Sequence, residues 1–191
     1  QGSFVVDIGG GTTEVALVSM GGIVLSHSIR IAGNKIDAAI SGFLKKQHAI
    51  LVTDRVAEQI KFDLADVRSE GKMEHIAVVR GRDIATGMPL TVDVNMAKVS
   101  EAIREPLQEI LGAIKWVLGR VPPELCADIL QNGIFLTGGS AALPNLDTMI
   151  ATEFGVPVSV ARDAGECTTL GAGYMADHFD MLGGSNSRNG G

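Results

Sequence analysis

Apolar and polar positions alternate along the first thirty residues in the manner of short β-strands. Apolar runs at 3–8 and 14–19 flank three consecutive glycines, and a third run covers 22–30. Every second residue of that third run lies on one apolar face: Ile23, Leu25, His27 and Ile29. Because this period is typical of strands and the Gly21-Gly22 pair suits a tight turn, the stretch predicts a three-stranded meander. On this apolar face we interpret His27 as a packing residue and not as a ligand.

Helical spacing replaces the alternation after the meander. Asn34 is a good N-cap, and Asp37 is placed to favour the exposed N–H groups of a first turn. Apolar residues then recur every three or four positions to about residue 48. Thr53 is expected to cap a second helix.

Two strands and a long helical pattern follow. The strands are predicted at 76–82 and 89–94, with a loop between them. From 95 to about 119 the apolar spacing predicts the longest helix of the chain. Pro106 lies inside this pattern and should kink the helix or split it in two, and Gly119 is placed to end it.

The last part of the chain repeats the arrangement with which it opens. An apolar strand from Gly133 ends in small residues and a second glycine pair, Gly138-Gly139. Pro144 is expected to start a helix at its tolerated first turn. A short strand is predicted at 156–160 and a final helix from about 168 to 179.

Composition and charge narrow the classes of function. The 191 residues are 46% hydrophobic and 20% charged, which is typical of a globular protein with a full core. A net charge of −6 argues against nucleic acid as the main partner. The only cysteines, Cys126 and Cys167, are too far apart for a metal knuckle, and no signal peptide or bilayer-spanning stretch is visible. We therefore expect a cytosolic protein, and the opening Gln1, close to a core strand, suggests a piece of a longer one.

The first glycine turn is the strongest candidate for chemistry. A glycine-rich backbone can bring its N–H groups close to a bulky anion, and Thr12 adds a hydroxyl at the end of Gly9-Gly10-Gly11. Asp7 ends the preceding strand, where its carboxylate could hold a hydrated divalent cation beside bound phosphates. The alternative is a glycine-rich hairpin that binds no ligand.

Two further segments could complete a nucleotide site. The second turn, Gly138-Gly139-Ser140-Ala141, is small enough for a ribose or base to lie against its backbone. The helix after Thr53 carries Glu58 and Lys61, which could contact a sugar and base. The alternative for these two charges is a solvated ion pair three residues apart.

Five segments in this order resemble the MreB family of bacterial actins, the rod shape-determining proteins. Together they span about residues 3–180, and it is their combination that is specific, since actins, chaperones and sugar kinases share the glycine turns. The segments are 5–22, 28–37, 57–61, 135–143 and 168–172.

The resemblance implies an α/β fold, the second lobe of an actin-like (ribonuclease H-like) ATPase. This lobe has a mixed sheet that opens with a three-stranded meander and is flanked by helices. Residues 1–182 would form the nucleotide-binding lobe, with an inserted subdomain at about 34–95 or beyond, and 183–191 a flexible tail.

The resemblance also implies ATP and Mg²⁺ as cofactors. It assigns residues to the nucleotide site, but it assigns no residue as a direct ligand of the metal. Asp7 matches the catalytic carboxylate on the magnesium side. The positions that match cofactor-binding residues are Gly9, Gly10, Gly11 and Thr12 in the phosphate turn, Glu58, Gln59, Ile60 and Lys61 in the nucleoside-contacting helix, and Gly138, Gly139, Ser140 and Ala141 in the adenosine-side loop.

By resemblance, the function is that of a protein that polymerises with ATP into filaments at the inner face of the cell membrane. Such filaments guide cell-wall synthesis, so the implied partners are other copies of the protein, the cell-wall elongation machinery and the membrane. The first lobe, with its own phosphate turn and membrane-binding elements, and the segment carrying a water-orienting glutamate have no match here. ATPase activity is therefore expected of an intact member and is expected to be weak or absent in these 191 residues.

Two other functions remain open from the sequence. One is half of a sugar or acetate kinase, which shares the fold, although no substrate-binding insertion follows the first hairpin. The other is a truncated scaffold that joins or caps filaments and barely binds ATP.

Overall fold

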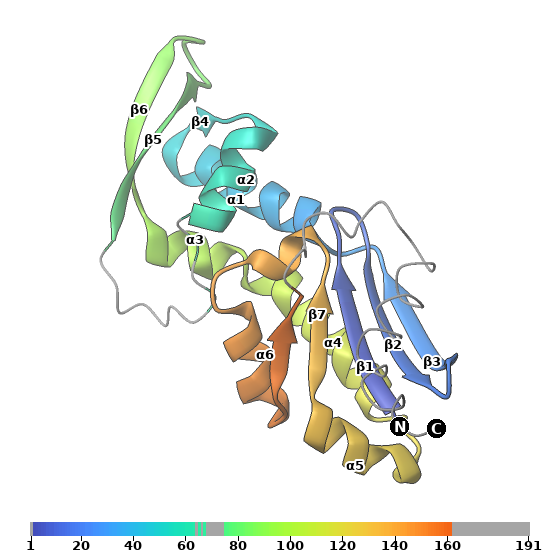
Figure 1. The fold of residues 1–191 in the computed structure, drawn as a ribbon. Helices are drawn as coiled ribbons and strands as arrows, with labels where there is room; N and C mark the ends of the chain where they lie inside the picture. Colours follow the sequence, from blue (N-terminus) through green and yellow to red (C-terminus); the bar gives the residue numbers. More distant parts are fainter. Residues whose placement is uncertain (1, 64, 66, 68–74, 162–191) are drawn as a thin grey trace, which may run out of the picture.

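The computed structural model describes residues 2–63, 65, 67 and 75–161. These residues form a five-stranded sheet in the order β3-β2-β1-β7-β8 and a three-stranded sheet in the order β4-β5-β6. Figure 1 shows the two sheets at opposite ends of an elongated molecule, with helices α1, α3 and α4 running between them.

The five-stranded sheet contains the predicted meander. Strands β1 (Gly2–Ile8), β2 (Thr13–Ser19) and β3 (Gly22–Ile29) pair antiparallel in chain order, which confirms that prediction. Strands β7 (Ile134–Thr137) and β8 (Val158–Val160) extend the sheet in parallel from β1, so the sheet is mixed.

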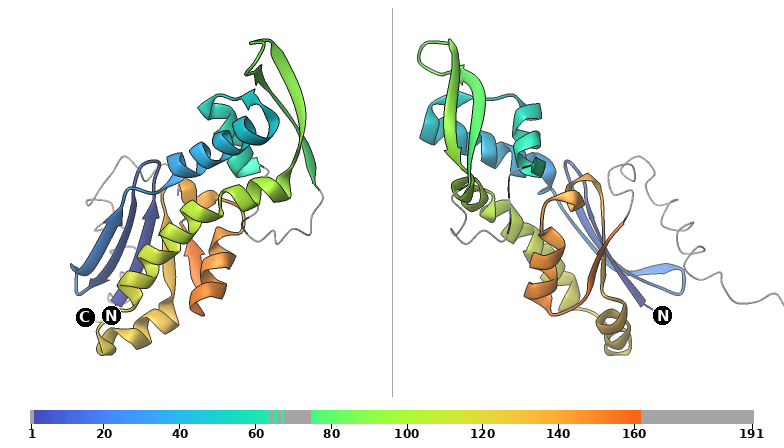
Figure 2. Two further views of the ribbon diagram at one scale, coloured as in Figure 1. Left: turned by 180° about the vertical axis from the view of Figure 1, so that it is seen from behind. Right: turned by 60° about the vertical axis from the view of Figure 1, so that its left-hand side comes forward.

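Helix α4 (Arg104–Leu118) covers one face of this sheet, as the left view of Figure 2 shows. It packs on β2 and β3. Alternate residues of the first two strands face the core and are fully buried, in agreement with the period of two in the sequence. They are Phe4, Val6, Ile8, Val15 and Leu17.

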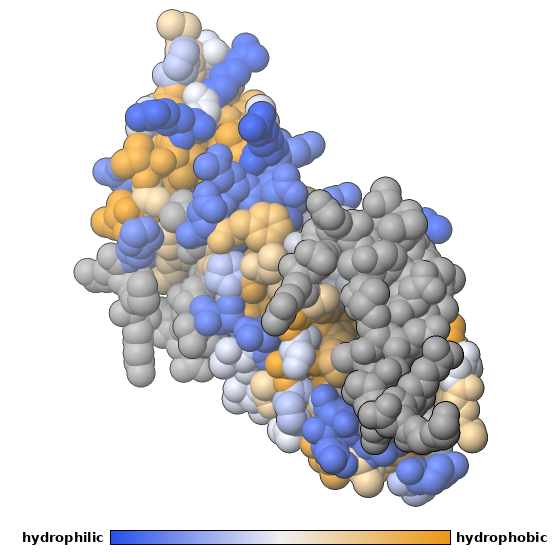
Figure 3. Space-filling view, in the orientation of Figure 1, coloured by the Kyte–Doolittle hydropathy of each residue, from blue (hydrophilic) through white to orange (hydrophobic). Residues whose placement is uncertain are grey.

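The smaller sheet is built from the middle of the chain. Its elements are α1 (Gly33–His48), β4 (Ile50–Leu51), α2 (Asp54–Asp63), β5 (Ile76–Asp83), β6 (Pro89–Asn95) and α3 (Met96–Ala102). The β5–β6 hairpin extends beyond the helices, and apolar side chains are visible over it in Figure 3. Ile76 and Val78 on β5 are each 61% exposed.

Two further helices and one short turn of helix flank β7. Helix α5 (Pro123–Asn132) leads into the strand, a 3₁₀ turn (η1, Gly139–Ala142) follows it, and α6 (Leu146–Phe154) leads on to β8. Pro144 was expected to start that last helix, and this was wrong. Asn145 adopts a left-handed conformation (φ 63°), which delays the helix until Leu146.

The predicted N-cap at Asn34 was also wrong. Helix α1 begins at Gly33, its cap residue is Ala32, and no side chain caps it. The N–H groups of Gly33 and Asn34 instead donate to the backbone carbonyls of Gly9 and Gly10, at 3.1 and 2.7 Å. Because the glycine turn supplies these acceptors, the helix needs no side-chain cap.

The long helical pattern is split, as Pro106 predicted, but the break lies earlier. Helix α3 ends at Ala102 and α4 begins at Arg104, with Ile103 between them. Pro106 then occupies the first turn of α4, where a missing N–H costs little. Gly119 ends α4 as expected.

The tight turn between β2 and β3 differs by one residue from the prediction. Met20 and Gly21 carry the positive φ values (52° and 75°), and Gly22 already pairs with Ser19 in the sheet. The predicted final helix and the predicted tail at 183–191 lie outside the described residues.

Candidate functional site

The two glycine turns lie side by side because their strands are neighbours. Strands β1 and β7 pair in parallel with Asp7 opposite Thr137, so both chains leave the sheet at the same edge. Gly138 follows β7 with φ 88°, and a Cβ there would lie 2.5 Å from the Ile8 carbonyl oxygen and 2.7 Å from the Asp7 Oδ1. Only glycine fits this approach.

A buried hydrogen bond joins the two turns. The Ser140 hydroxyl donates to the carbonyl oxygen of Gly9 at 2.9 Å, and Ser140 is 3% exposed. The same carbonyl accepts the Gly33 N–H at the start of α1. The Gly9 carbonyl is therefore held by two donors from distant parts of the chain.

These bonds fix the orientation of the first turn. The carbonyls of Gly9 and Gly10 both accept N–H groups from the start of α1. In a trans peptide the N–H of the next residue points opposite to the carbonyl. The N–H groups of Gly10 and Gly11 therefore point away from α1, on the side where both residues are exposed.

Backbone N–H groups that point outward from a turn are positively polarised and can bind anions. Gly10, Gly11 and Thr12 are all exposed, and within the described residues neither glycine N–H has an acceptor. Neither Gly10 nor Gly11 has a positive φ, so a left-handed backbone conformation is not the reason for glycine at these two positions. A Cβ at Gly10 would lie 3.2 Å from the Asn34 Oδ1, whereas a Cβ at Gly11 would meet nothing within 4 Å.

Asp7 lies at the edge of this site and is half-buried. Burial raises the pKa of its carboxyl, and the neighbouring carboxylate of Glu14 raises that pKa further. Together the two acidic residues line a hollow of about 200 Å³ on the sheet. Burial and Glu14 both disfavour the ionised carboxylate of Asp7, and a nearby cation would offset this effect. The carboxylate therefore suits the predicted place beside a hydrated Mg²⁺. Among the described residues there is no group of three or more potential metal-ligating side chains.

The α2 helix places its four predicted residues differently. Glu58 and Gln59 are exposed, whereas Ile60 and Lys61 are 4% and 2% exposed. The predicted alternative of a solvated Glu58–Lys61 pair is wrong, because Lys61 Nζ contacts the Asp37 carboxylate, at 3.0 Å from Oδ1 and 3.1 Å from Oδ2.

The sequence did not single out this role of Asp37. Its spacing suggested a first-turn acid, which was wrong, because α1 begins at Gly33 and has no acidic residue in its first turn. A contact between two helices leaves no signal in local periodicity. The ion pair becomes visible only when α1 and α2 are packed together.

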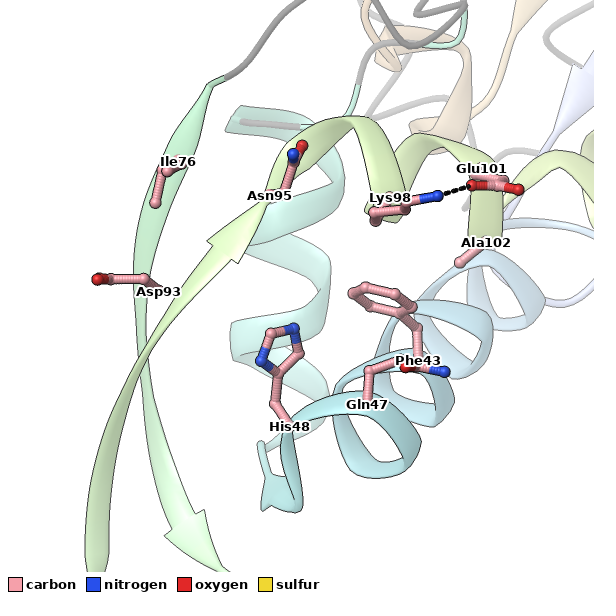
Figure 4. A pocket seen from close by; sticks show the side chains of 9 residues that line it. All are labelled: Phe43, Gln47, His48, Ile76, Asp93, Asn95, Lys98, Glu101 and Ala102. Carbon is pink, nitrogen blue, oxygen red and sulfur yellow. Dashed lines mark hydrogen bonds and ion pairs between the residues drawn. The ribbon is translucent and has the colours of Figure 1, made fainter.

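A larger pocket than the one beside Asp7 lies elsewhere. It measures about 610 Å³, and its lining includes Phe43 and His48 of α1, Asp93 of β6 and Lys98 of α3. Figure 4 shows this pocket with the Lys98–Glu101 ion pair at its side. None of the residues predicted to bind nucleotide lines it.

In comparisons with known proteins, the chain matches the family model described as "MreB/Mbl protein" over residues 1–184. It is 46% identical over 182 residues to the cell shape-determining protein Mbl of Bacillus subtilis (strain 168), covering 95% of this chain and 54% of that protein. It is 42% identical over 183 residues to the cell shape-determining protein MreB of Escherichia coli (strain K12), covering 96% and 52%.

Solved structures agree with the fold. The crystal structure of MreB 5 of Spiroplasma citri bound to AMPPNP superposes with a TM-score of 0.81 at 30% identity, over 95% of this chain and 54% of that chain. The MamK double helical filament gives a TM-score of 0.70 at 23% identity, over 92% of this chain and 54% of the MamK chain. At this identity the likeness supports the fold alone. The chain thus has the predicted actin-like α/β fold and spans about half the length of the curated relatives it matches.

Proposed function

The chain belongs to the MreB/Mbl family of actin-like cell shape-determining proteins, and from this premise we propose that it binds ATP through its two glycine turns as part of a filament-forming protein. The relative from Spiroplasma citri is described as bound to AMPPNP and, in a second structure, to ADP. An adenine nucleotide is therefore the ligand class to expect at the corresponding turns.

One observation carries the proposal: the outward orientation of the Gly10 and Gly11 N–H groups. The hydrogen bonds from Gly33, Asn34 and Ser140 hold the turn in this orientation through contacts within the chain. A site whose donors are already in place loses little conformational entropy when an anion binds. The phosphates of the nucleotide are the matching anions.

The remaining predicted residues take roles that their exposure permits. Asp7 would lie on the magnesium side of the phosphates, where Mg²⁺ supplies neutralisation of the phosphate charge. Glu58 and Gln59, exposed on α2, would contact the nucleoside, and Gly139 on the second turn would leave room for it.

The assembly and location follow from the family and are part of the proposal. We propose that the protein self-associates into filaments at the inner face of the cell membrane and guides the cell-wall elongation machinery. In the described part of the chain, no helix has the length and apolar character to span a bilayer. Membrane contact is proposed through the lobe of the relatives that these residues do not match.

The proposal is tested by equilibrium binding of ADP to the chain and to Gly11→Ala. Because a Cβ at Gly11 meets nothing within 4 Å, this variant should fold normally and place a methyl group in the open space beside the turn. Gly112→Ala on α4 is the matched control, since its Cβ also meets nothing within 4 Å and lies on a helix away from the turns.

We expect Gly11→Ala to weaken ADP binding about tenfold or more, because a buried phosphate would lose contact with the backbone, while Gly112→Ala binds as the original chain does. Equal affinities for the two variants would contradict the proposed site. A chain that binds no ADP but co-sediments with filaments of a full-length relative would favour the scaffold function instead.

A further inference from the structure

Asp37 and Lys61 form an ion pair that is almost fully removed from solvent. Lys61 is 2% exposed, and the side chains of Lys61 and Asp37 are 3% and 15% exposed. An ammonium group is rarely buried without a partner, because desolvation of the charge costs several kcal/mol. The carboxylate of Asp37 is the charge partner that Lys61 has at this place.

The ammonium lies beside Gly33, the residue whose N–H donates to the Gly9 carbonyl. A Cβ at Gly33 would lie 3.3 Å from Lys61 Nζ and 3.3 Å from the Gly9 carbonyl oxygen, and it would overlap the Ser140 hydroxyl. The lysine head group, the Gly9 carbonyl and the Ser140 hydroxyl thus share the space in front of Gly33. A Cβ at that position would force the Ser140 hydroxyl to move away from the Gly9 carbonyl.

The pair is not fully compensated. Burial raises the pKa of Asp37, the hydrogen bond and charge of Lys61 oppose that rise, and Glu58 and Asp54 on α2 raise the pKa further. Asp37 Oδ1 lies 3.0 Å from Lys61 Nζ, yet it accepts no aligned hydrogen bond from it. A merely stabilising pair would be expected to satisfy both carboxylate oxygens.

We infer that Asp37 is a positioning residue of the nucleotide site, which holds the Lys61 ammonium beside Gly33, the donor to the Gly9 carbonyl, and so helps to keep the phosphate-binding N–H groups oriented outward. The inference rests on the proposed function, which it deepens. Lys61 then acts through the turn from the buried side and does not lie on the exposed wall with Glu58 and Gln59. Its positive charge also adds to the potential that attracts phosphate.

The alternative explanation predicts the opposite sign. If Asp37 were only a negative charge near an anion site, its removal would strengthen phosphate binding by reducing repulsion. If Asp37 positions Lys61, its removal leaves the ammonium buried without its charge partner, so the ammonium must move. The turn then loses its support and phosphate binding weakens.

The test measures the affinities of the full chain for two probes, ADP and inorganic pyrophosphate. Asp37→Asn should weaken the binding of both probes about tenfold, the effect expected for the loss of a charged hydrogen-bond partner. Glu101→Gln is the matched control, since Glu101 also lies 3.0 Å from a lysine, Lys98, but in a pair that is 64% and 62% exposed. The control should change neither affinity.

A second variant separates positioning from stability. Replacing both charges in Asp37→Asn/Lys61→Met leaves no buried ion, so it should recover the melting temperature if the single variant lowers it. Because Lys61 no longer supports the turn, the double variant should still bind both probes about tenfold more weakly than the original chain. Recovery of affinity together with stability would overturn the inference.

The remaining outcomes are also decisive. Tighter or unchanged binding of both probes by Asp37→Asn would overturn the inference while leaving the proposed function intact. Failure of the original chain to bind either probe would overturn the proposed function, and the inference with it. If Asp37→Asn does not fold, the double variant alone decides, by the same affinity criterion.

Discussion

The Ser140 hydroxyl donates a buried 2.9 Å hydrogen bond to the Gly9 carbonyl, across 131 residues of sequence. This bond joins the end of β1 to the turn that follows β7, where the two strands already run in parallel. By resemblance, Ser140 was predicted to belong to the adenosine-side loop. Its hydroxyl bonds to the opposite turn, so we expect Ser140 to affect nucleotide binding through the shape of the site.

Ser140→Ala should lower stability and weaken nucleotide binding together. The Gly9 carbonyl keeps its bond from Gly33, so the loss should be about 1 kcal/mol, that of one buried hydrogen bond. Urea denaturation monitored by circular dichroism measures this change. Ser28→Ala, an exposed serine on β3, is the control and should leave the free energy of unfolding within about 0.5 kcal/mol.

Gly138→Ala and Gly139→Ala should differ strongly although the residues are adjacent. A Cβ at Gly138 requires a left-handed residue and lies 2.5 Å from the Ile8 carbonyl oxygen, whereas one at Gly139 meets nothing within 4 Å. We expect Gly138→Ala to cost more than about 2 kcal/mol, or to prevent folding, and Gly139→Ala to cost less than about 1 kcal/mol. Thermal melting of the two variants is the measurement, and equal melting temperatures would refute the close approach of the two turns.

Asp7→Asn should stabilise the chain at neutral pH when no nucleotide is present. The pKa of Asp7 is raised above its ordinary value of 3.8 by burial and by Glu14. Its stabilising contribution is therefore present below pH 3.8 and is lost as the pH rises through the raised pKa. The variant should melt at a higher temperature than the original chain at pH 7, and the difference should shrink as the pH falls toward 4.

Glu101→Gln is the control for Asp7→Asn, because the pKa of Glu101 is shifted in the opposite direction. Lys98 lowers the pKa of Glu101, so the ionised form is favoured in the folded chain, on an exposed surface where the effect is small. This variant should not melt at a higher temperature at pH 7. A rise in melting temperature as large as that of Asp7→Asn would show that removal of any negative charge stabilises this acidic chain, whatever the pKa of the residue removed.

The ring of His27 stacks on that of Trp116, with centroids 4.6 Å apart, and joins β3 to α4. Arg120 lies over the same tryptophan at 3.9 Å. His27→Ala should cost about 1 kcal/mol beyond the loss of buried area. Because Trp116 is the only tryptophan of the chain, its fluorescence reports this contact directly, and an unchanged emission spectrum in the variant would contradict the stacking.

Much of the fold could be predicted from local pattern. The period of two gave the meander, and the apolar spacing gave α1, α2 and the split long helix. The apolar face of a strand packs against a neighbouring element, so His27 was predicted to be a packing residue. Its contact with Trp116 agrees with this prediction. These features depend on neighbours in sequence, so the sequence alone carries them.

What could not be predicted depends on contacts between distant segments. Asn34 is a residue type that often caps helices. The glycine turn instead supplies the acceptors for the first N–H groups of α1, and this depends on how β1 and α1 are placed relative to each other. Lys61 has a sequence neighbour of opposite charge in Glu58, yet its partner is Asp37, 24 residues away on another helix. Gly138 was predicted only as part of a turn small enough for a nucleoside, whereas its neighbours Ile8 and Asp7 make glycine obligatory.

The most direct test of the nucleotide site is a titration of the isotope-labelled chain with ADP, followed by two-dimensional amide NMR. If the glycine turns bind the nucleotide, the largest shifts will fall on the amides of Gly10, Gly11 and Thr12 and of the second turn, 138–141. Amides around the larger hollow, such as those of Phe43 and Lys98, should move little. Unmoved turn amides at saturating ADP, with shifts confined to that hollow, would contradict the assignment of the glycine turns as the nucleotide site.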